Sequence, residues 1–307
     1  MSQDFELERK EAGFSLSYCG LELISGDFPF AFAGHGKESV SMRRGNFDIS
    51  DYVEARLPLS LDGWERVSAG RAASTADSAA GAASASGEAE ELRLDLAGGD
   101  ARLRLTVREL RIPAACGEDD LWLELKFQSA SPGLNRFWFR IATAPDERFY
   151  GCGEQFSHLD LTGRRFPLWT SEQGVGRNKS TPITFQADLD GGSGGDYWWT
   201  FYPEPSFVSS RGYYLHAETS AYAAFDFSRG DFAELEFWEL PSRILIAPRG
   251  SMLGAARAAS ALLGRQPELP DWTQEGVILG IQGGTETCLA KLERALSRGV
   301  PVSGIWA

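Results

Sequence analysis

The sequence has 307 residues, of which 43% are hydrophobic and 12% aromatic, so it can form two domains with a substantial apolar core. Lys and Arg number 30 against 43 Asp and Glu, which gives a net charge of -13 at pH 7. Because this charge repels phosphate backbones and anionic lipid headgroups, we expect neither a nucleic acid nor a membrane as partner.

The amino terminus lacks the features of an export signal. Residues 1–14 contain no apolar segment and no small-residue cleavage site, and no apolar run elsewhere reaches the length of a membrane span. We therefore expect a cytoplasmic protein. Cys19, Cys116, Cys152 and Cys288 lie far apart, so they are expected to be buried thiols rather than disulfides or zinc ligands. No metal or cofactor is predicted.

Short strands dominate the first 250 residues. Apolar and polar residues alternate over 14–24, and again over 92–96 and 103–107, where Gly98-Gly99 supplies a turn between them. The second pattern predicts a β-hairpin. The same period of two recurs over 121–127, 136–141, 223–227 and 244–246. Many short strands separated by turns predict an antiparallel β-sandwich.

Residues 73–91 interrupt this pattern. They are rich in Ala, Ser and Gly and contain no large apolar side chain. Because such a segment cannot pack in a core, we predict a mobile surface loop between strands.

The pattern changes after residue 251. A helical face is followed by Gly264 and by a connector stiffened by Pro267 and Pro270, which predicts a domain boundary between residues 265 and 266. An apolar strand at 277–281, predicted to be buried on both faces, precedes a helix starting at Thr285 and a second apolar strand at 300–307. This is a β-α-β unit without a third strand. We therefore expect the chain to be the amino-terminal part of a longer protein.

Five segments resemble the bacterial sulfoquinovosidases of glycoside hydrolase family 31. They are GCGEQFSHLDLTGRRFPLWTSEQGVGRNKS (151–180), GGDYWWTFYPEPSFVSSRGYY (194–214), LLGRQPELPDW (262–272), GIQGGTE (280–286) and GIWA (304–307). Upstream of about residue 148, only the richness in strands is shared. The resemblance implies a galactose-mutarotase-like sandwich over residues 1–265, and the first β-α-β of a TIM barrel over residues 266–307.

The resemblance also implies a retaining α-glycosidase that acts on small-molecule glycosides. Its two catalytic carboxylates would be aspartates on later barrel strands, outside residues 1–307, so no catalytic residue is assigned and this chain alone is expected to be inactive. Glu154, Asp160, Glu172 and Asp271 are isolated acids, which favours surface or capping roles. The groups that would recognise a sulfonate also lie after residue 307 by resemblance.

Three residues are candidates for binding the sugar. Gln282 follows the first barrel strand, and its amide can both donate to and accept from sugar hydroxyls; the resemblance places a glutamine of this segment in the sugar pocket. Trp169 and Arg177 belong to a glycine-rich loop that family analogy brings near the leaving group. Gln282 could instead cap its strand, and the loop could make an ordinary interdomain contact. Aromatic residues 197–199 are predicted to be core rather than sugar platforms.

Other functions fit the sequence less well. A neutral-sugar α-glucosidase of the same family is an alternative, as is a non-catalytic carbohydrate-binding sandwich, although the latter does not need a β-α-β unit. Aldose mutarotase activity would need a histidine and a glutamate in a cleft, and His35, His158 and His216 have no such sequence context. The sequence does not indicate an oligomeric state.

Overall fold

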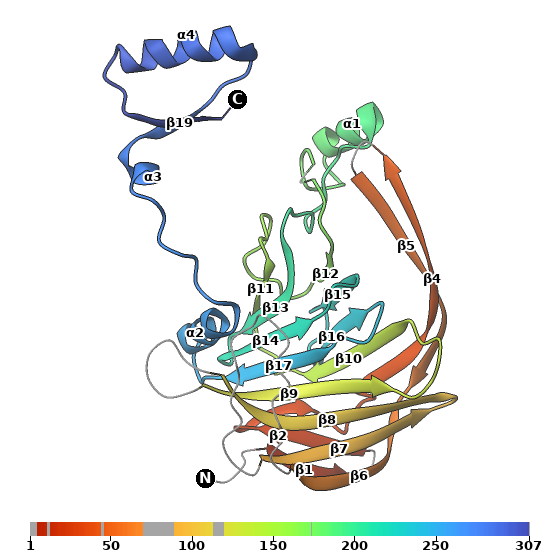
Figure 1. The fold of residues 1–307 in the computed structure, drawn as a ribbon. Coiled ribbons are helices and arrows are strands. Elements are labelled where there is room, and N and C mark those ends of the chain that lie inside the picture. Colours follow the sequence, from red (N-terminus) through yellow and green to blue (C-terminus); the bar gives the residue numbers. More distant parts are fainter. Residues whose placement is uncertain are drawn as a thin grey trace. The chain divides into compact units, whose positions relative to one another are not determined.

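The computed structural model describes residues 5–10, 13–43, 46–69, 89–112, 120–172 and 174–306. The chain divides into two compact units, Met1–Leu263 and Gly264–Ala307, which are described separately (Figure 1). Of the loop predicted at 73–91, residues 73–88 lie outside the described residues, and 89–91 belong to a strand, β7.

The first unit is built mainly from strands. Its two helices are α1 (Pro182–Gly191) and α2 (Met252–Leu263). Its strands are β1 (Phe5–Lys10), β2 (Gly13–Tyr18), β3 (Leu21–Ile24), β4 (Ala31–Arg43), β5 (Asn46–Pro58), β6 (Ser60–Ala69), β7 (Ala89–Gly98), β8 (Ala101–Ile112), β9 (Asp120–Ser129), β10 (Arg136–Ala142), β11 (Phe149–Gly153), β12 (Arg165–Leu168), β13 (Pro203–Ser209), β14 (Tyr213–Glu218), β15 (Ala223–Asp226), β16 (Phe232–Phe237) and β17 (Arg243–Pro248).

Two large antiparallel sheets form the sandwich. Among the described residues, one has the strand order β12-β15-β16-β10-β4-β5 and the other the order β11-β13-β14-β17-β9-β8-β7-β6. A small sheet, β1-β2-β3, adds Phe14, Leu16 and Tyr18 to the core. Buried leucines and phenylalanines from both large sheets form one continuous cluster. The predicted mainly-β sandwich is confirmed, and the β7–β8 hairpin pairs Gly98 with Ala101 as its turn signal predicts.

One prediction was incomplete. Residues 14–24 form two strands, because Cys19 and Gly20 adopt φ angles of 50° and 76° and reverse the chain between β2 and β3. Positive φ at both central positions is typical of a tight hairpin turn, but Cys-Gly lacks the usual Asn-Gly signal. The thiol of Cys19 lies in this turn and is exposed, so the prediction of buried thiols is wrong there; Cys152 and Cys288 are buried.

Helix α2 covers part of the outer face of the larger sheet. Ala255 and Ala258 on α2 are buried, and they pack against Trp122, Tyr214 and Leu245 of β9, β14 and β17. Small side chains on the helix allow this close approach. Within the described residues, no helix is both long and apolar enough to span a bilayer.

The second unit is a β-α-β arrangement, as predicted. It contains α3 (Trp272–Glu275), β18 (Val277–Gly280), α4 (Gly284–Leu296) and β19 (Val302–Trp306), and β18 pairs with β19 in parallel. Val277 and Ile278 are 45% and 55% exposed, so the predicted burial of this strand on both faces is not observed. A buried parallel strand needs cover on both faces, and α3 and α4 of this unit leave much of β18 exposed.

The aromatic core gives the first test. Phe139 on β10 is fully buried against Phe30 and Phe127, with ring centroids 6.3 Å and 5.4 Å away. Phe139→Ala should lower the free energy of unfolding by about 3–5 kcal/mol, because it leaves a cavity between the sheets. Tyr52→Ala, at an exposed position of β5, is the control. Urea unfolding measures both variants, and equal losses would contradict the assigned core.

Candidate functional site

A segment rich in turns, residues 154–202, connects β11 to β13 and carries most of the candidate site. It includes β12 and α1. At its start, the backbone of Gly153 packs closely against the backbone of Tyr202. Gly153 has φ 81°, and a Cβ there would lie 2.1 Å from the carbonyl oxygen of Tyr202. Only glycine tolerates this geometry. The Thr200 hydroxyl also donates a hydrogen bond to the Glu154 carbonyl, which closes the base of the segment.

Trp169 lies directly after β12 and is half-buried. Its ring contacts Phe47, with centroids 6.0 Å apart, and Trp198, with centroids 5.5 Å apart. A pocket of about 270 Å³ opens beside it. The pocket is lined by Phe47, Asp48, Ile49, Arg165, Pro167, Trp169, Lys179, Asp196, Trp198, Trp199 and Tyr222. A second pocket, of about 360 Å³, shares Ile49, Trp169 and Tyr222 with the first.

The polar groups of the first pocket carry both signs of charge. The Lys179 ammonium lies 3.0 Å from a carboxylate oxygen of Asp188 and donates to the Gly194 carbonyl at 2.7 Å. It also lies 5.2 Å from the ring centre of Trp199. Asp196 accepts the backbone N–H of Tyr197 through one oxygen. Aromatic faces combined with carboxylate acceptors suit a ligand with apolar C–H faces and many hydroxyls, such as a sugar.

Arg177 holds the backbone beside this pocket through hydrogen bonds. It has φ 49°, and its guanidinium donates to the Ser157 hydroxyl and to the carbonyls of Tyr197 and Trp199, the last at 2.7 Å. Burial lowers its pKa, partly opposed by the charge of Asp196. These bonds fix the backbone from which the pocket's tryptophans project. Arg177 itself is not among the residues that line the two pockets around Trp169.

Gln282 belongs to the second unit, whereas Trp169 and Arg177 belong to the first. Gln282 is exposed and follows Ile281, whose N–H donates to the Trp306 carbonyl at 2.9 Å. Gly283 and Gly284 have φ angles of 122° and 81° and turn the chain into α4. The side chain therefore stands at the carboxyl end of β18, where parallel β-α folds place their ligands.

Several pocket residues were missed from the sequence. Phe47, Asp48 and Ile49 come from the far end of the β4–β5 hairpin, and Tyr222 comes from the turn before β15. No motif marks them, because they meet Trp169 only through the fold. Residues 197–199 pack in or against the core as predicted, and two of them also line the pocket. Trp199 is buried, and Tyr197 and Trp198 pack against the core, yet both tryptophans also line the pocket.

One of the three histidines, His216, has acidic neighbours in the fold. His216 on β14 places Nδ1 3.8 Å from a carboxylate oxygen of Glu204, and no hydrogen-bond partner for that buried nitrogen is found among the described residues. Burial lowers its pKa and outweighs the attraction of Glu204 and Glu218, while Arg243 acts in the same direction as burial. None of the pockets around Trp169 includes this histidine.

This histidine predicts a pH effect on stability. Because its pKa is lower in the folded state, the unfolded chain binds the proton more readily. Stability is therefore fully present above the unfolded value, about 6.5, and falls as the pH drops toward the folded value. Thermal unfolding measured at pH values from about 6.5 downward should show the fall in stability. In His216→Gln this fall should be smaller. His158, whose pKa burial also lowers, leaves a residual slope. Identical pH profiles for the two proteins would contradict this role.

Comparison with known families identifies the chain. The model of the "Glycosyl hydrolase 31 N-terminal galactose mutarotase-like domain" matches residues 2–183. The chain therefore belongs to glycosyl hydrolase family 31. The match begins well before residue 148, so the kinship extends further toward the amino terminus than the motifs indicated.

Three similar proteins are all named sulfoquinovosidase. The chain is 39% identical to the sulfoquinovosidase of Escherichia coli (strain K12) over 99% of its own length and 41% of the relative. It is 42% identical to the sulfoquinovosidase of Agrobacterium fabrum (strain C58), covering 97% of this chain and 40% of the relative. A solved family 31 sulfoquinovosidase from E. rectale, in complex with an aza-sugar inhibitor, has 36% identity and a TM-score of 0.78 over 98% of this chain and 40% of that one. The chain thus spans about two fifths of its relatives' length.

Proposed function

We propose that the full-length protein is a retaining α-glycosidase that hydrolyses α-sulfoquinovosides in the cytoplasm. The observation that carries this proposal is the identity of 39% and 42% to two sulfoquinovosidases over nearly the whole of this chain. The aza-sugar inhibitor bound to the E. rectale relative further supports a small-molecule sugar as substrate. Both catalytic carboxylates are assigned to the sequence after residue 307.

The surroundings of Asp160 are consistent with that assignment. Retention needs two carboxyl groups about 5–5.5 Å apart. Asp160 is engaged instead with the Thr162 N–H and with Arg148, 3.1 Å away. Burial tends to raise the pKa of Asp160, but hydrogen bonds from Thr162 and the charge of Arg148 outweigh it and hold the pKa below its usual range. Such an acid stays ionised and is suited to an ion pair rather than to proton donation.

In this proposal the present chain contributes part of the sugar site. The aromatic pocket around Trp169 provides a platform, Arg177 fixes the backbone of its tryptophans, and the Gln282 amide bonds sugar hydroxyls. A neutral-sugar α-glucosidase and a non-catalytic carbohydrate-binding sandwich are the alternatives that the experiments below separate.

Turnover tests the activity directly. Protein of full length should hydrolyse an aryl α-sulfoquinovoside faster than an aryl α-glucoside, and the 307-residue chain should hydrolyse neither, because it lacks both carboxylates. Preference for the glucoside would favour the neutral-sugar alternative. Sugar binding by a full-length protein without turnover would favour the binding module, and turnover by residues 1–307 would place the catalytic groups within them.

Gln282→Ala tests the polar contact. One uncharged hydrogen bond contributes about 0.5–1.5 kcal/mol, so kcat/KM should fall about 2- to 13-fold. Gln274→Ala is a matched control, because Gln274 is an exposed glutamine of the same unit, on α3. Equal kinetics for the two variants would reject the role of Gln282.

Trp169→Ala tests the aromatic platform. The loss of a stacking ring should raise KM about 2- to 13-fold, from about 0.5–1.5 kcal/mol for an aromatic contact. Trp64→Ala, on β6 and half-exposed, removes an indole away from the pocket and should leave KM unchanged. A similar KM for both variants would show that the pocket does not hold the sugar.

A further inference from the structure

The β4–β5 hairpin leaves the rest of its sheet halfway along its length. β4 pairs with β10 only from Ala31 to Gly34, whereas its pairing with β5 continues to Arg43. A β-bulge at His35/Gly36 marks the departure. Figure 1 shows the two strands extending beyond the other strands of the sandwich toward α1. The outer half of the β4–β5 hairpin therefore lacks the pairing with β10 that holds the inner half.

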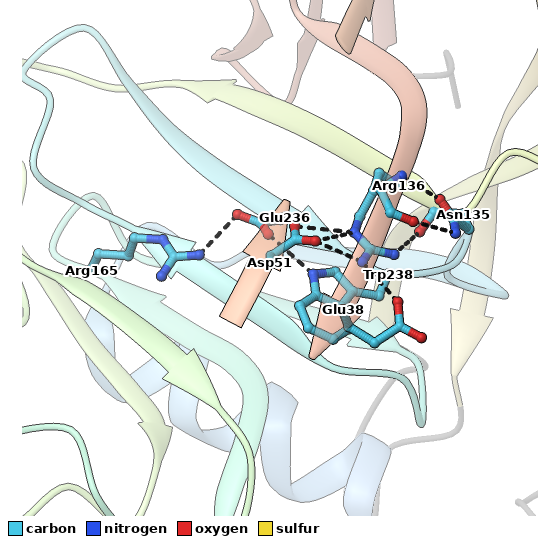
Figure 2. Close-up of polar contacts among 8 residues, drawn as sticks. Glu38, Asp51, Asn135, Arg136, Arg165, Glu236 and Trp238 are labelled. Carbon is cyan, nitrogen blue, oxygen red and sulfur yellow. Dashed lines mark hydrogen bonds and ion pairs between the residues drawn. The ribbon is translucent and has the colours of Figure 1, made fainter. Parts of the chain in front are cut away.

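Side chains replace that missing neighbour at the bulge. The Asn135 amide accepts the Gly36 N–H at 2.9 Å and donates to the Gly36 carbonyl at 3.0 Å, as a paired strand would. Next to it, Arg136 is 2% exposed and points at the hairpin. Its guanidinium contacts an Asp51 oxygen at 2.8 Å and a Glu38 oxygen at 3.1 Å (Figure 2).

We call Arg136, Glu38 and Asp51 the clamp. It joins both strands of the hairpin, because Glu38 on β4 is the register partner of Asp51 on β5. Burial lowers the pKa of Arg136, but the hydrogen bonds that its guanidinium donates to Asp51 and Glu38 outweigh this effect, and the net shift is upward. Space for the guanidinium depends on Gly36. A Cβ at that position would lie 2.8 Å from Arg136 Nε.

The same guanidinium connects to the pocket. It lies 4.2 Å from the ring centre of Trp238, and the Trp238 ring lies 4.2 Å from the ring of Tyr222. Trp238 Nε1 donates to Glu236, and Glu236 accepts from Arg165 at 2.9 Å (Figure 2). Tyr222 and Arg165 both line the pocket beside Trp169.

The outer half of the hairpin also contributes residues to the pocket directly. Side chains two residues apart on a strand share a face, so the face that carries Glu38 and Asp51 also carries the next pairs, Val40–Ile49 and Met42–Phe47. Of these residues, Ile49 and Phe47 line the pocket, and Phe47 contacts Trp169. The clamped face therefore supplies two of the three β5 residues that line the pocket, the third being Asp48.

We propose that Arg136 is a positioning residue: it fixes the outer half of the hairpin and, through Trp238, the Tyr222 wall, so that the pocket around Trp169 keeps its shape. The effect on catalysis rests on the proposed sugar-binding function, whereas the effect on the hairpin does not. Arg136 is buried and Asp51 mostly so, whereas Glu38 is half exposed. Removing the cation destabilises the hairpin locally, because Asp51 loses its partner and the two carboxylates repel each other.

Hydrogen–deuterium exchange measures the hairpin directly. In Arg136→Gln, amides of residues 37–52 should exchange about tenfold faster or more, while β8 and β9 exchange as before. Arg136→Lys should restore part of the protection, since it keeps the charge without the fork. Arg140→Gln is the matched control. Arg140 lies on the same face of β10 and pairs with Glu234 at 2.7 Å, so its loss should leave residues 37–52 unchanged.

A second variant tests the same contact if Arg136→Gln does not fold. Asp51→Asn removes the partner on β5 and leaves Arg136 paired with Glu38, so the sandwich should fold while the hairpin loosens. Unchanged exchange at 37–52 in the folded variants, or an equal rise in β8 and β9, would overturn the proposal.

Kinetics of the full-length protein then separate the two claims. Arg136→Gln should raise KM for an aryl α-sulfoquinovoside severalfold with little change in kcat, because the substrate pocket is loosened and the reacting groups are untouched. If the unaltered protein hydrolyses no glycoside, the proposed function fails and the exchange result still decides the clamp. If it is active and KM is unchanged in a variant with a loosened hairpin, the link from clamp to pocket is wrong.

Discussion

Two sheets that each have one apolar face must bury those faces against each other, and the rest of the sandwich follows from this constraint. Because side chains alternate along a strand, burying Phe137, Phe139 and Ile141 of β10 turns Arg136 and Arg140 to the outer face. On β16, the same alternation turns the acidic residues outward, and the register pairs Arg140 with Glu234. The ion pairs of the outer face are therefore a consequence of the phenylalanine core.

The pocket shows how a β-sandwich gains a concave site. A rigid pair of sheets supplies fixed strand ends, and the turn-rich segment between β11 and β13 brings its tryptophans to one of them. Glycine at 153 permits the close backbone contact that closes the segment, and Arg177 holds its carbonyls. Polar groups that could bind a ligand are thus oriented before a ligand arrives, which limits the entropy lost on binding.

Local patterns predicted the parts of the fold that local forces determine. Alternating leucines on either side of Gly98-Gly99 identified the β7–β8 hairpin, and continuous apolar runs identified the parallel pair β18 and β19. The β4–β5 hairpin was missed, because its outer half is mostly exposed and its apolar alternation is short, with only Val40 and Met42 on β4 and Phe47 and Ile49 on β5. Family motifs made Trp169 and Gln282 candidates. They gave no sign of Phe47, Tyr222 or Arg136, since these residues meet their neighbours only through contacts between residues distant in sequence.

The position of β5 at the edge of its sheet has a further consequence for association between molecules. A long edge strand offers its free N–H and C=O groups to any other strand, including the same strand of a second copy. Here β5 carries Asp48, Asp51 and Glu54, so two such edges would bring like charges together. Salt screens this repulsion. The acidic side chains of β5 therefore oppose its use as a template for aggregation, most strongly at low ionic strength.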